Sequence, residues 1–327
     1  MPTIEISGLC NLNCVFCAYK EKGAGKTVMS TEDFASYVNQ MAAMGYRELS
    51  LTPQTGDVFI DKNLTDKIDV LEDHPGIEAY EFITNLVGAT PKALTRLSKA
   101  RKLTRMYISL YGHDVEGFQN ITKRPALQHQ RLVENIRQLT QLAKHFTAQI
   151  GSFVMTDRDF VWSPFAPPRN DDTELMVAMR ELAEKAKNFF WSGNHVDFDS
   201  WGGRITQQEL DDLDKGFQLV GPTVPMTGPC GMLFGGFVVL ADGGVNACAC
   251  RAVGESLLIG NATTTPIKDI VSPDNPRYIQ ILDAHRRDVY PAACVNCKIF
   301  SSVYRRPHRR ETVSVDEYLA KMRLRCK

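Results

Sequence analysis

Apolar residues follow two alternating patterns along the first two thirds of the chain. Short runs of alternating polarity predict strands, at Thr3–Ser7, Glu48–Thr52, Ala79–Thr84, Thr104–Leu110, Ala148–Met155 and His195–Asp199. Between them, apolar residues three or four positions apart predict helices, at Phe34/Val38/Met41, Leu64/Ile68/Leu71, Pro91 onward, Leu132/Ile136/Leu139 and Leu175/Met179/Leu182. Strands that alternate with helices indicate a parallel sheet with crossover helices, either an open doubly wound sheet or a partial barrel.

The pattern changes after residue 215. Gly216–Gly228 has the composition of a linker, and Phe237–Leu240 and Val245–Cys248 flank an Ala-Asp-Gly-Gly turn, as a β-hairpin would. A helix is predicted near Tyr278–His285. We therefore expect an α/β protein of two domains, residues 1–215 and 216–327.

Charge is balanced in this chain of 327 residues, with 38 Lys and Arg against 38 Asp and Glu. This balance does not favour binding to nucleic acid or to an anionic membrane, so a small substrate is expected. The start of the chain has no leader pattern, and no apolar run reaches the roughly 18 residues of a membrane helix. A cytoplasmic protein is the expectation.

Cysteine is the most informative residue type. Three of the nine cysteines lie at Cys10, Cys14 and Cys17, and the other six lie in the last third of the chain. Cytoplasmic thiols stay reduced, so metal ligands or buried thiols are expected rather than disulfides.

The first three cysteines fall within eight residues, in the loop that follows the first strand. Three thiolates at this spacing can hold three irons of a cubane cluster and leave the fourth iron open to another ligand. A structural zinc site is the alternative, but such sites usually have four ligands, and no fourth Cys or His lies nearby.

This motif resembles the signature of the radical S-adenosylmethionine (SAM) superfamily, CxxxCxφC, with Phe16 at the aromatic position φ. The resemblance implies a 4Fe-4S cluster whose open iron binds SAM and whose electron cleaves SAM to a 5′-deoxyadenosyl radical. It also implies a partial (β/α)6 TIM-like barrel with this loop at its C-terminal mouth. A flavodoxin or ferredoxin-type reductant is implied as the electron donor.

Three further segments are similar to family positions near SAM. Thr55, Gly56 and Asp57 stand where the family has a Gly-Gly-Glu segment that holds the SAM amino group. Asn85 and Ser109 lie at the ends of the third and fourth predicted strands, and the resemblance implies that they approach SAM or the substrate.

Four later cysteines form a second set. Twelve residues separate Cys230 from Gly243, four more lead to Cys248, and Cys294 and Cys297 form a CxxC pair. This set resembles the auxiliary-cluster extension of radical SAM enzymes called SPASM or Twitch, in its shorter one-cluster Twitch form. The resemblance implies a second 4Fe-4S cluster closed by four thiolates, and a zinc ribbon is the alternative.

Two cysteines and one arginine complete the candidates. Cys250 is near the second set and is either a buried spare thiol or the donor of a hydrogen atom to a substrate radical. Cys326 lies among basic residues near the end of the sequence and is interpreted as a dispensable thiol. Arg204 follows the sixth predicted strand and is a candidate substrate contact.

The expected reaction is radical SAM chemistry on a small polar molecule. No peptide-recognition domain precedes Cys10, which favours a sugar or aminocyclitol. Hydrogen abstraction from a carbinol C–H would then lead to dehydrogenation, if the electron passes to the second cluster, or to epimerisation, if a thiol returns a hydrogen atom. The alternatives are a maturase of ribosomal peptides or sulfatases and a non-catalytic iron-sulfur or zinc protein.

Overall fold

The computed structural model describes residues 1–19, 27–52, 54–146, 152–157, 173–186, 188–194, 197–213, 216–251, 255–304 and 314–326. Most strands belong to one nine-stranded sheet in the order β11-β10-β9-β1-β2-β3-β4-β5-β6. They are β1 Thr3–Ile4, β2 Glu48–Ser50, β3 Ala79–Thr84, β4 Leu103–Leu110, β5 Ser152–Asp157, β6 Asn188–Asn194, β9 Val238–Val239, β10 Gly244–Asn246 and β11 Leu258–Asn261. Strands β1 to β6 are parallel to one another, which confirms the partial (β/α)6 barrel.

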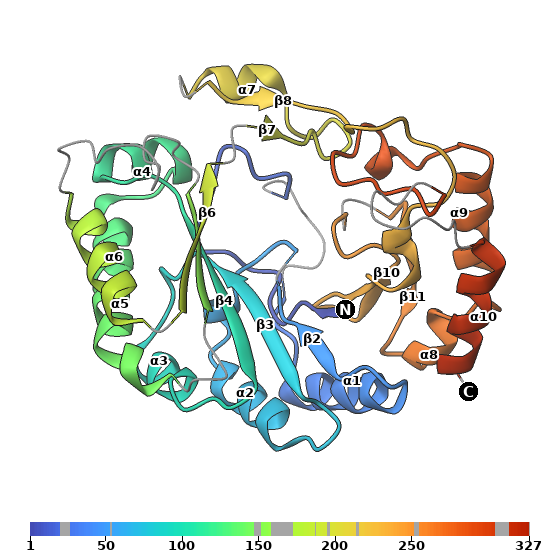
Figure 1. Ribbon diagram of the computed structural model, residues 1–327, viewed down its shortest axis with the longest axis horizontal. Helices are drawn as coiled ribbons and strands as arrows, with labels where there is room; N and C mark the ends of the chain where they lie inside the picture. Colours follow the sequence, from blue (N-terminus) through green and yellow to red (C-terminus); the bar gives the residue numbers. More distant parts are fainter. Residues whose placement is uncertain are drawn as a thin grey trace.

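Helices cover the outer side of this curved sheet (Figure 1). The helices of the barrel are α1 Thr31–Ala43, α2 Leu64–Asp73, α3 Pro91–Leu97, α4 Val115–Thr122, α5 Ala126–Leu142 and α6 Glu174–Lys185. Short 3-10 turns follow β2 at Val58–Ile60 (η1) and α5 at Ala143–His145 (η2). Local signals set the helix starts: the Ser30 side chain accepts from the Asp33 amide to cap α1, and Pro91 occupies the first turn of α3.

The sixth barrel strand is not where the sequence pattern placed it. The structure has β6 at Asn188–Asn194, whereas Asp197–Phe198 forms β7, which pairs with β8 (Gln218–Leu219) in a separate two-stranded sheet. Residues 195 and 196 of the predicted strand, like residues 148–151 of the predicted fifth strand, lie outside the described residues. The sequence of β6 contains the continuous apolar run Phe189, Phe190 and Trp191, and a run without alternation lacks the period-two signal by which the other strands were predicted.

The C-terminal region extends the barrel sheet. Strand β9 pairs in parallel with β1, in the register Thr3 to Val238 and Ile4 to Val239, and β10 and β11 continue the sheet antiparallel. This confirms the predicted hairpin. The proposed domain boundary falls beside residues 214 and 215, which lie outside the described residues.

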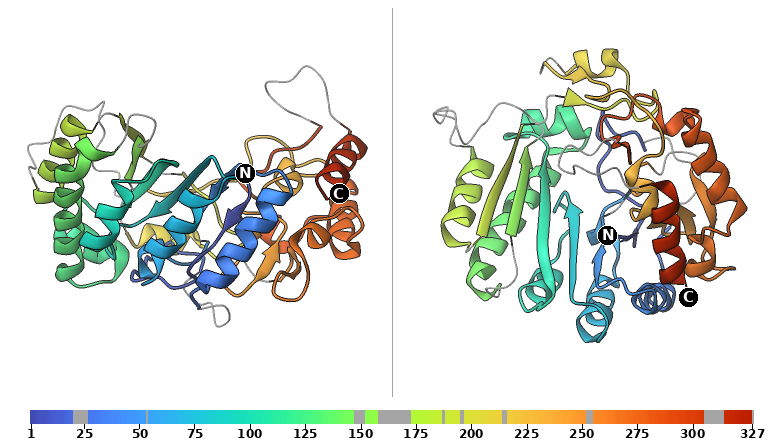
Figure 2. Two further views of the ribbon diagram at one scale, coloured as in Figure 1. Left: turned by 90° about the horizontal axis from the view of Figure 1, so that it is seen from below. Right: turned by 45° about the vertical axis from the view of Figure 1, so that its right-hand side comes forward.

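Short helices pack around this hairpin. They are α8 Ile267–Ile270, α9 Pro276–Arg286 and α10 Val315–Cys326, with 3-10 turns η3 Gly231–Phe234 and η4 Ala292–Cys294. Helix α7 (Gln207–Asp211) lies apart from them, beside β8. Figure 2 shows α10, in dark red, at the same end of the molecule as α1. Buried residues of the barrel and of the hairpin form one continuous hydrophobic core, which joins Ile4 and Val38 to Val245 and Ile259. Within the described residues, no helix is both long enough and apolar enough to cross a bilayer.

A buried ion pair fixes the start of α1 to α2. The side chains of Lys67 and Asp61 are 0% and 1% exposed and form a short ion pair. The Lys67 ammonium also donates to the Met29 carbonyl oxygen at 2.7 Å, at the end of the loop that carries the first cysteines. Breaking one side of such a pair leaves an uncompensated charge in the interior.

We expect Lys67→Met to lower the free energy of unfolding by about 3–5 kcal/mol, because Asp61 would remain buried without its counter-ion. The matched control is Arg96→Met, which removes a partly exposed pair with Asp69 and should cost no more than about 1 kcal/mol. Urea denaturation of the two variants gives the comparison. Equal losses of stability would contradict the role assigned to Lys67.

Candidate functional site

The first three cysteines lie in the loop directly after β1. Cys14 is buried, Cys17 is half-buried, and Cys10 is exposed. The Cys17 amide donates to the Cys14 carbonyl oxygen at 3.0 Å, and the Leu12 amide donates to the Cys10 sulfur at 3.4 Å. The loop is therefore a tight turn in which one backbone amide, that of Leu12, faces a cysteine sulfur.

Backbone hydrogen bonds attach this loop to the end of α4. The amides of Asn13 and Val15 donate to the carbonyl oxygens of Thr122 and Ile121, each at 3.0 Å. The loop is thus held between β1 and α4 at the carboxyl edge of the parallel strands, where the active sites of barrel enzymes lie.

Asn85 connects the end of β3 to the cysteine loop. The side-chain amide nitrogen of Asn85 donates to the side-chain oxygen of Asn11 at 2.9 Å. The same nitrogen lies 3.7 Å from the Cys10 sulfur. Ser109 is near the end of the neighbouring strand β4 and is 4% exposed. Thr84 of β3 pairs with Ile108 of β4, and Asn85 and Ser109 are the next residues along these two parallel strands. Both therefore lie at the carboxyl edge of the sheet. The structure therefore places Asn85 against the first cysteine site.

The segment after β2 is fixed by a carboxylate that the sequence analysis did not select. Glu5 accepts hydrogen bonds from the amides of Gln54 and Thr55 at 2.6 and 2.9 Å. The Thr55 hydroxyl donates to the Gly8 carbonyl oxygen at 3.2 Å. Glu5 is 2% exposed, so its charge is stabilised by these donors instead of water. Its only sequence signal is a charged residue inside an otherwise buried strand segment.

Gly56 and Asp57 hold the segment after β2 against the first cysteine loop and the end of β3. A Cβ atom on Gly56 would lie 2.2 Å from the Ser7 carbonyl oxygen and 2.4 Å from that of Leu9, so only glycine allows this approach. The Asp57 carboxylate is buried and accepts from the amides of Phe59 and Asn85 and from the Thr84 hydroxyl. Burial raises the pKa of Asp57, and these hydrogen bonds oppose that rise. The Asp57 side chain thus links the end of β3 to the segment after β2. That Thr55, Gly56 or Asp57 contacts SAM stays a prediction.

Phe16 belongs to an aromatic cluster beside the cysteine loop. Its ring centroid lies 5.1 Å from that of Phe198 and 5.8 Å from that of Tyr111. Phe198 in turn packs against Phe217 at 5.0 Å. The loop is therefore packed against β7 and the residue before β8 by tilted and edge-on rings, which exclude water from one side of it.

The second cysteine set lines one pocket. Its four members, Cys230, Cys248, Cys294 and Cys297, are joined there by Cys250, and the five residues come from the start of η3, the loop after β10 and the region of η4. Burial raises the pKa values of Cys230, Cys294 and Cys297, and that of Cys294 reaches about 12. Within the described residues, no three Cys, His, Asp or Glu side chains are close enough to hold one metal ion, so the thiols surround a space instead of a point.

Cys250 differs from the other thiols of the pocket. A hydrogen bond from the Cys248 thiol lowers the pKa of Cys250 to about 7 and raises that of Cys248 well above its ordinary value. Cys250 is half-buried, whereas the other four thiols are buried. The structure thus brings this fifth cysteine to the same pocket, and its role as hydrogen donor stays a prediction.

A buried arginine joins this pocket to the segment after β7. Arg251 is 1% exposed; its guanidinium pairs with Asp199 after β7 and donates to the Cys297 sulfur at 3.1 Å. The guanidinium also lies 4.7 Å from the ring centroid of Trp201. The Asp199 carboxylate accepts from the Lys298 amide as well, next to Cys297. Neither Asp199 nor Arg251 belongs to a cysteine motif, so sequence spacing gave no signal for them.

Two donors of the pocket wall have no partner. Within the described residues, Nε of Arg251 and both ring nitrogens of His285 are buried without a hydrogen bond, and both residues line the pocket. Burial lowers the pKa of His285 to about 4, so its ring is neutral. Buried thiols facing unpaired N–H groups fit an iron-sulfur cluster, because its thiolate and sulfide sulfurs accept hydrogen bonds.

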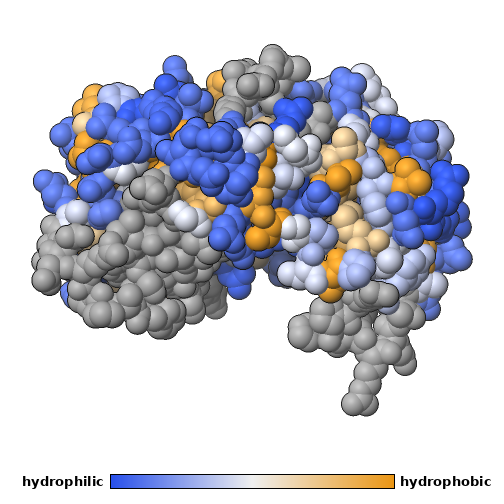
Figure 3. Space-filling model, turned by 90° about the horizontal axis from the view of Figure 1, so that it is seen from above, coloured by the Kyte–Doolittle hydropathy of each residue, from blue (hydrophilic) through white to orange (hydrophobic). Residues whose placement is uncertain are grey.

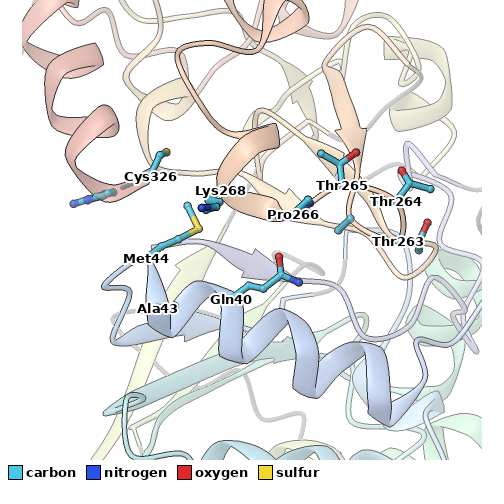
Figure 4. Close-up of a pocket in the computed structure, with 11 residues that line it drawn as sticks. Gln40, Ala43, Met44, Thr263, Thr264, Thr265, Pro266, Lys268 and Cys326 are labelled. Carbon is cyan, nitrogen blue, oxygen red and sulfur yellow. The ribbon is translucent and has the colours of Figure 1, made fainter.

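Arg204 and Cys326 lie away from these thiols. Arg204 is exposed in the turn after β7, and its contact with substrate stays a prediction. Cys326 lines a surface pocket of about 570 Å³ between α1, the start of α8 and the end of α10 (Figure 4).

Figure 3, which looks onto the molecule from above, shows hydrophobic patches near the middle of a largely hydrophilic face.

Comparison with protein families gives two matches. Residues 4–163 match the model of the Radical SAM superfamily, and residues 230–298 match that of an iron-sulfur cluster-binding domain called SPASM. The first match contains Cys10, Cys14 and Cys17, and the second contains the five cysteines of the pocket. No curated protein sequence matches the chain.

Solved structures share the fold at low sequence identity. BtrN in complex with AdoMet and 2-DOIA is 16% identical with a TM-score of 0.52, and the match covers 96% of each chain. SuiB of Streptococcus suis bound to S-adenosylmethionine is 14% identical with a TM-score of 0.52, covering 86% of this chain and 67% of that one. Native anSMEcpe with AdoMet and the Kp18Cys peptide is 13% identical with a TM-score of 0.54, covering 100% and 96%.

We expect Gly56→Ala to remove the iron bound at the first cysteine set while leaving the second set loaded. The added methyl group would overlap backbone atoms of Ser7 and Leu9, and overpacking of this kind costs about 1–3 kcal/mol or more. Gly88→Ala is the matched control, because its Cβ would meet Phe59 at an ordinary 3.4 Å. Iron and sulfide analysis after anaerobic reconstitution separates the two variants, and equal iron contents would refute the packing argument.

Proposed function

Because the chain belongs to the radical SAM superfamily and carries a SPASM domain, we propose that it abstracts a hydrogen atom from a carbinol C–H of a sugar, aminocyclitol or similar small polar molecule. The substrate is then dehydrogenated or epimerised. Proteins of these two families bind SAM, a 4Fe-4S cluster and additional iron-sulfur clusters. We assign the first cluster to Cys10, Cys14 and Cys17, and a second to Cys230, Cys248, Cys294 and Cys297.

One observation carries the choice of substrate class. Five of the six later cysteines converge on a single pocket, and the sixth, Cys326, lies in another pocket. This arrangement supplies ligands for one auxiliary cluster, as in the Twitch form, which resembles sugar-modifying and aminocyclitol-modifying members. The shared fold with BtrN, whose structure contains 2-DOIA, supports the same choice.

The side chains at the barrel edge have separable tasks in this proposal. When bound, the first cluster supplies the electron that cleaves SAM, and the resulting radical removes a hydrogen atom from the substrate. Asn85 holds the Cys10 turn, and Glu5 holds the segment of Thr55 to Asp57, so both prepare the SAM site. Phe16 and its aromatic neighbours keep water from one side of the loop. Ser109 and Arg204 are proposed to contact SAM and the substrate, respectively.

The fate of the substrate depends on Cys250. Dehydrogenation requires loss of one further electron and one proton, which gives a carbonyl group and needs no thiol. Epimerisation requires return of a hydrogen atom from an S–H group. We favour dehydrogenation, because a cysteine beside a cluster loop is more often a packed residue than a reactive one.

A peptide substrate is the second candidate. It is favoured by the likeness to SuiB, which was solved with the precursor peptide SuiA, and to anSMEcpe, which was solved with peptides. Formation of 5′-deoxyadenosine in the presence of aminocyclitols, sugars or peptides discriminates between the two. Turnover with peptides alone would overturn the small-molecule proposal.

The ligand sets should be separable by mutation. The chain should hold about eight irons after reconstitution, as two cubanes require. Replacing Cys10, Cys14 and Cys17 together by Ala should halve the iron and abolish SAM cleavage. Replacing Cys294 and Cys297 should also halve the iron, but it should leave some uncoupled SAM cleavage. An unchanged cleavage rate in the triple variant would remove the central assignment.

Solvent deuterium decides between the two outcomes of the substrate radical. In deuterated water, an epimerase puts one solvent deuterium into its product through the exchangeable S–H group, and Cys250→Ala stalls it after 5′-deoxyadenosine is formed. A dehydrogenase incorporates no deuterium at the oxidised carbon and tolerates Cys250→Ala. We expect the second result. Cys326→Ala is the control, because that thiol lies outside the pocket.

A further inference from the structure

His285 is completely buried, with 0% of its surface exposed, and it projects from α9 into the wall of the five-cysteine pocket. Its ring meets the Tyr290 ring edge-on at 4.8 Å, which accounts for its packing but provides no acceptor in the ring plane. Neither Nδ1 nor Nε2 has a hydrogen-bond partner among the described residues. A neutral imidazole always carries one N–H donor, so one donor is buried without an acceptor.

Such an orphan is costly. A buried donor without an acceptor costs about 1–3 kcal/mol, and native structures keep few of them. A hydrophobic residue at position 285 would avoid this cost, since the surrounding wall includes Leu233, Ile299 and Phe300. The polar ring therefore indicates that something in the pocket accepts its hydrogen bond.

The acceptor that fits is sulfur. Besides apolar side chains, the pocket wall consists of five thiols and Arg251, whose Nε is also buried without a partner. Arg251 already donates through its Nη2 to the Cys297 sulfur at 3.1 Å, so N–H to sulfur contacts occur at this wall. The pocket wall thus has two unpaired donors, Nε of Arg251 and the ring N–H of His285. A bound group whose outer atoms accept hydrogen bonds would satisfy both.

We propose that the N–H of His285 donates a hydrogen bond to a sulfur of the second iron-sulfur cluster and raises its reduction potential. This inference rests on the proposed assignment of that cluster to Cys230, Cys248, Cys294 and Cys297. Reduction adds one negative charge to the cluster, and a donor stabilises the more negative form more strongly. His285 is thus a positioning and tuning residue that makes the second cluster a better electron acceptor.

The first test replaces the donor and keeps the ring. His285→Phe should lower the midpoint potential of the second cluster, with an about tenfold fall in the reduced-to-oxidised ratio at a fixed potential, or about 59 mV. The control is His129→Phe in α5, which makes the same change at a buried ring 5.5 Å from Phe118 with an unpaired Nε2, outside the cysteine pocket. It should leave the potential unchanged. Redox titration followed by electron paramagnetic resonance gives both values.

A second measurement covers the case in which His285→Phe does not hold its cluster. The full chain is labelled with ¹⁵N-histidine, its second cluster is reduced, and pulsed electron paramagnetic resonance records nitrogen couplings. A histidine coupling that is present in the unaltered chain and in His129→Phe supports the proposal.

The outcomes separate this inference from the ligand assignment. If the unaltered chain binds only about four irons, the assignment of the second cluster fails. If the chain binds about eight irons but shows neither a histidine coupling nor a shift in potential with His285→Phe, the inference about His285 is overturned and the assignment stands.

Discussion

Strand β1 is the element on which both cysteine sites depend, because its two residues are hydrogen-bonded to the barrel on one side and to the C-terminal hairpin on the other. The Thr3 amide donates to the Phe237 carbonyl oxygen at 3.0 Å, and the Glu5 amide donates to that of Val239 at 2.8 Å. The first cysteine loop begins directly after β1, and Cys248 follows β10, which pairs with β9. The two proposed clusters are therefore positioned by one continuous backbone ladder instead of by a flexible domain contact.

Three charged groups buried around this ladder have hydrogen-bond or ion-pair partners. Glu5 is surrounded by amides, Lys67 by Asp61 and a carbonyl oxygen, and Arg251 by Asp199, Trp201 and the Cys297 sulfur. Each of these groups joins two segments that are distant in sequence, and each would be costly if left alone. The pairing of β1 with β9 connects the hairpin to the barrel sheet. The ion pair between Arg251, which follows the hairpin, and Asp199, which follows β7, connects the hairpin to a second segment. Rigid spacing between the two cysteine sites is the result.

The sequence was sufficient for features encoded locally. Cysteine spacing, the Ser30 cap and the alternation of Ala79–Thr84 depend on neighbouring residues, and they led to the barrel, its family and the candidate ligands. Features set by tertiary contacts were not predicted. Strand β6 is an apolar run without alternation, and only its pairing with β5 identifies it as a barrel strand. Glu5, Asp199 and His285 gain their importance only from residues brought near by folding. A buried histidine in a helix has the same sequence signature whether it faces a cluster or a hydrophobic core.

The pairing of β1 with β9 has a consequence for the order in which the protein is made. Thr3 and Ile4 leave the ribosome 235 residues before their pairing partners Val238 and Val239. Until then, β1 is an edge strand whose outward hydrogen-bonding groups have no partner, and contacts between such distant segments form slowly. The strand that precedes the first cysteine loop therefore reaches its final pairing only after the hairpin has been synthesised.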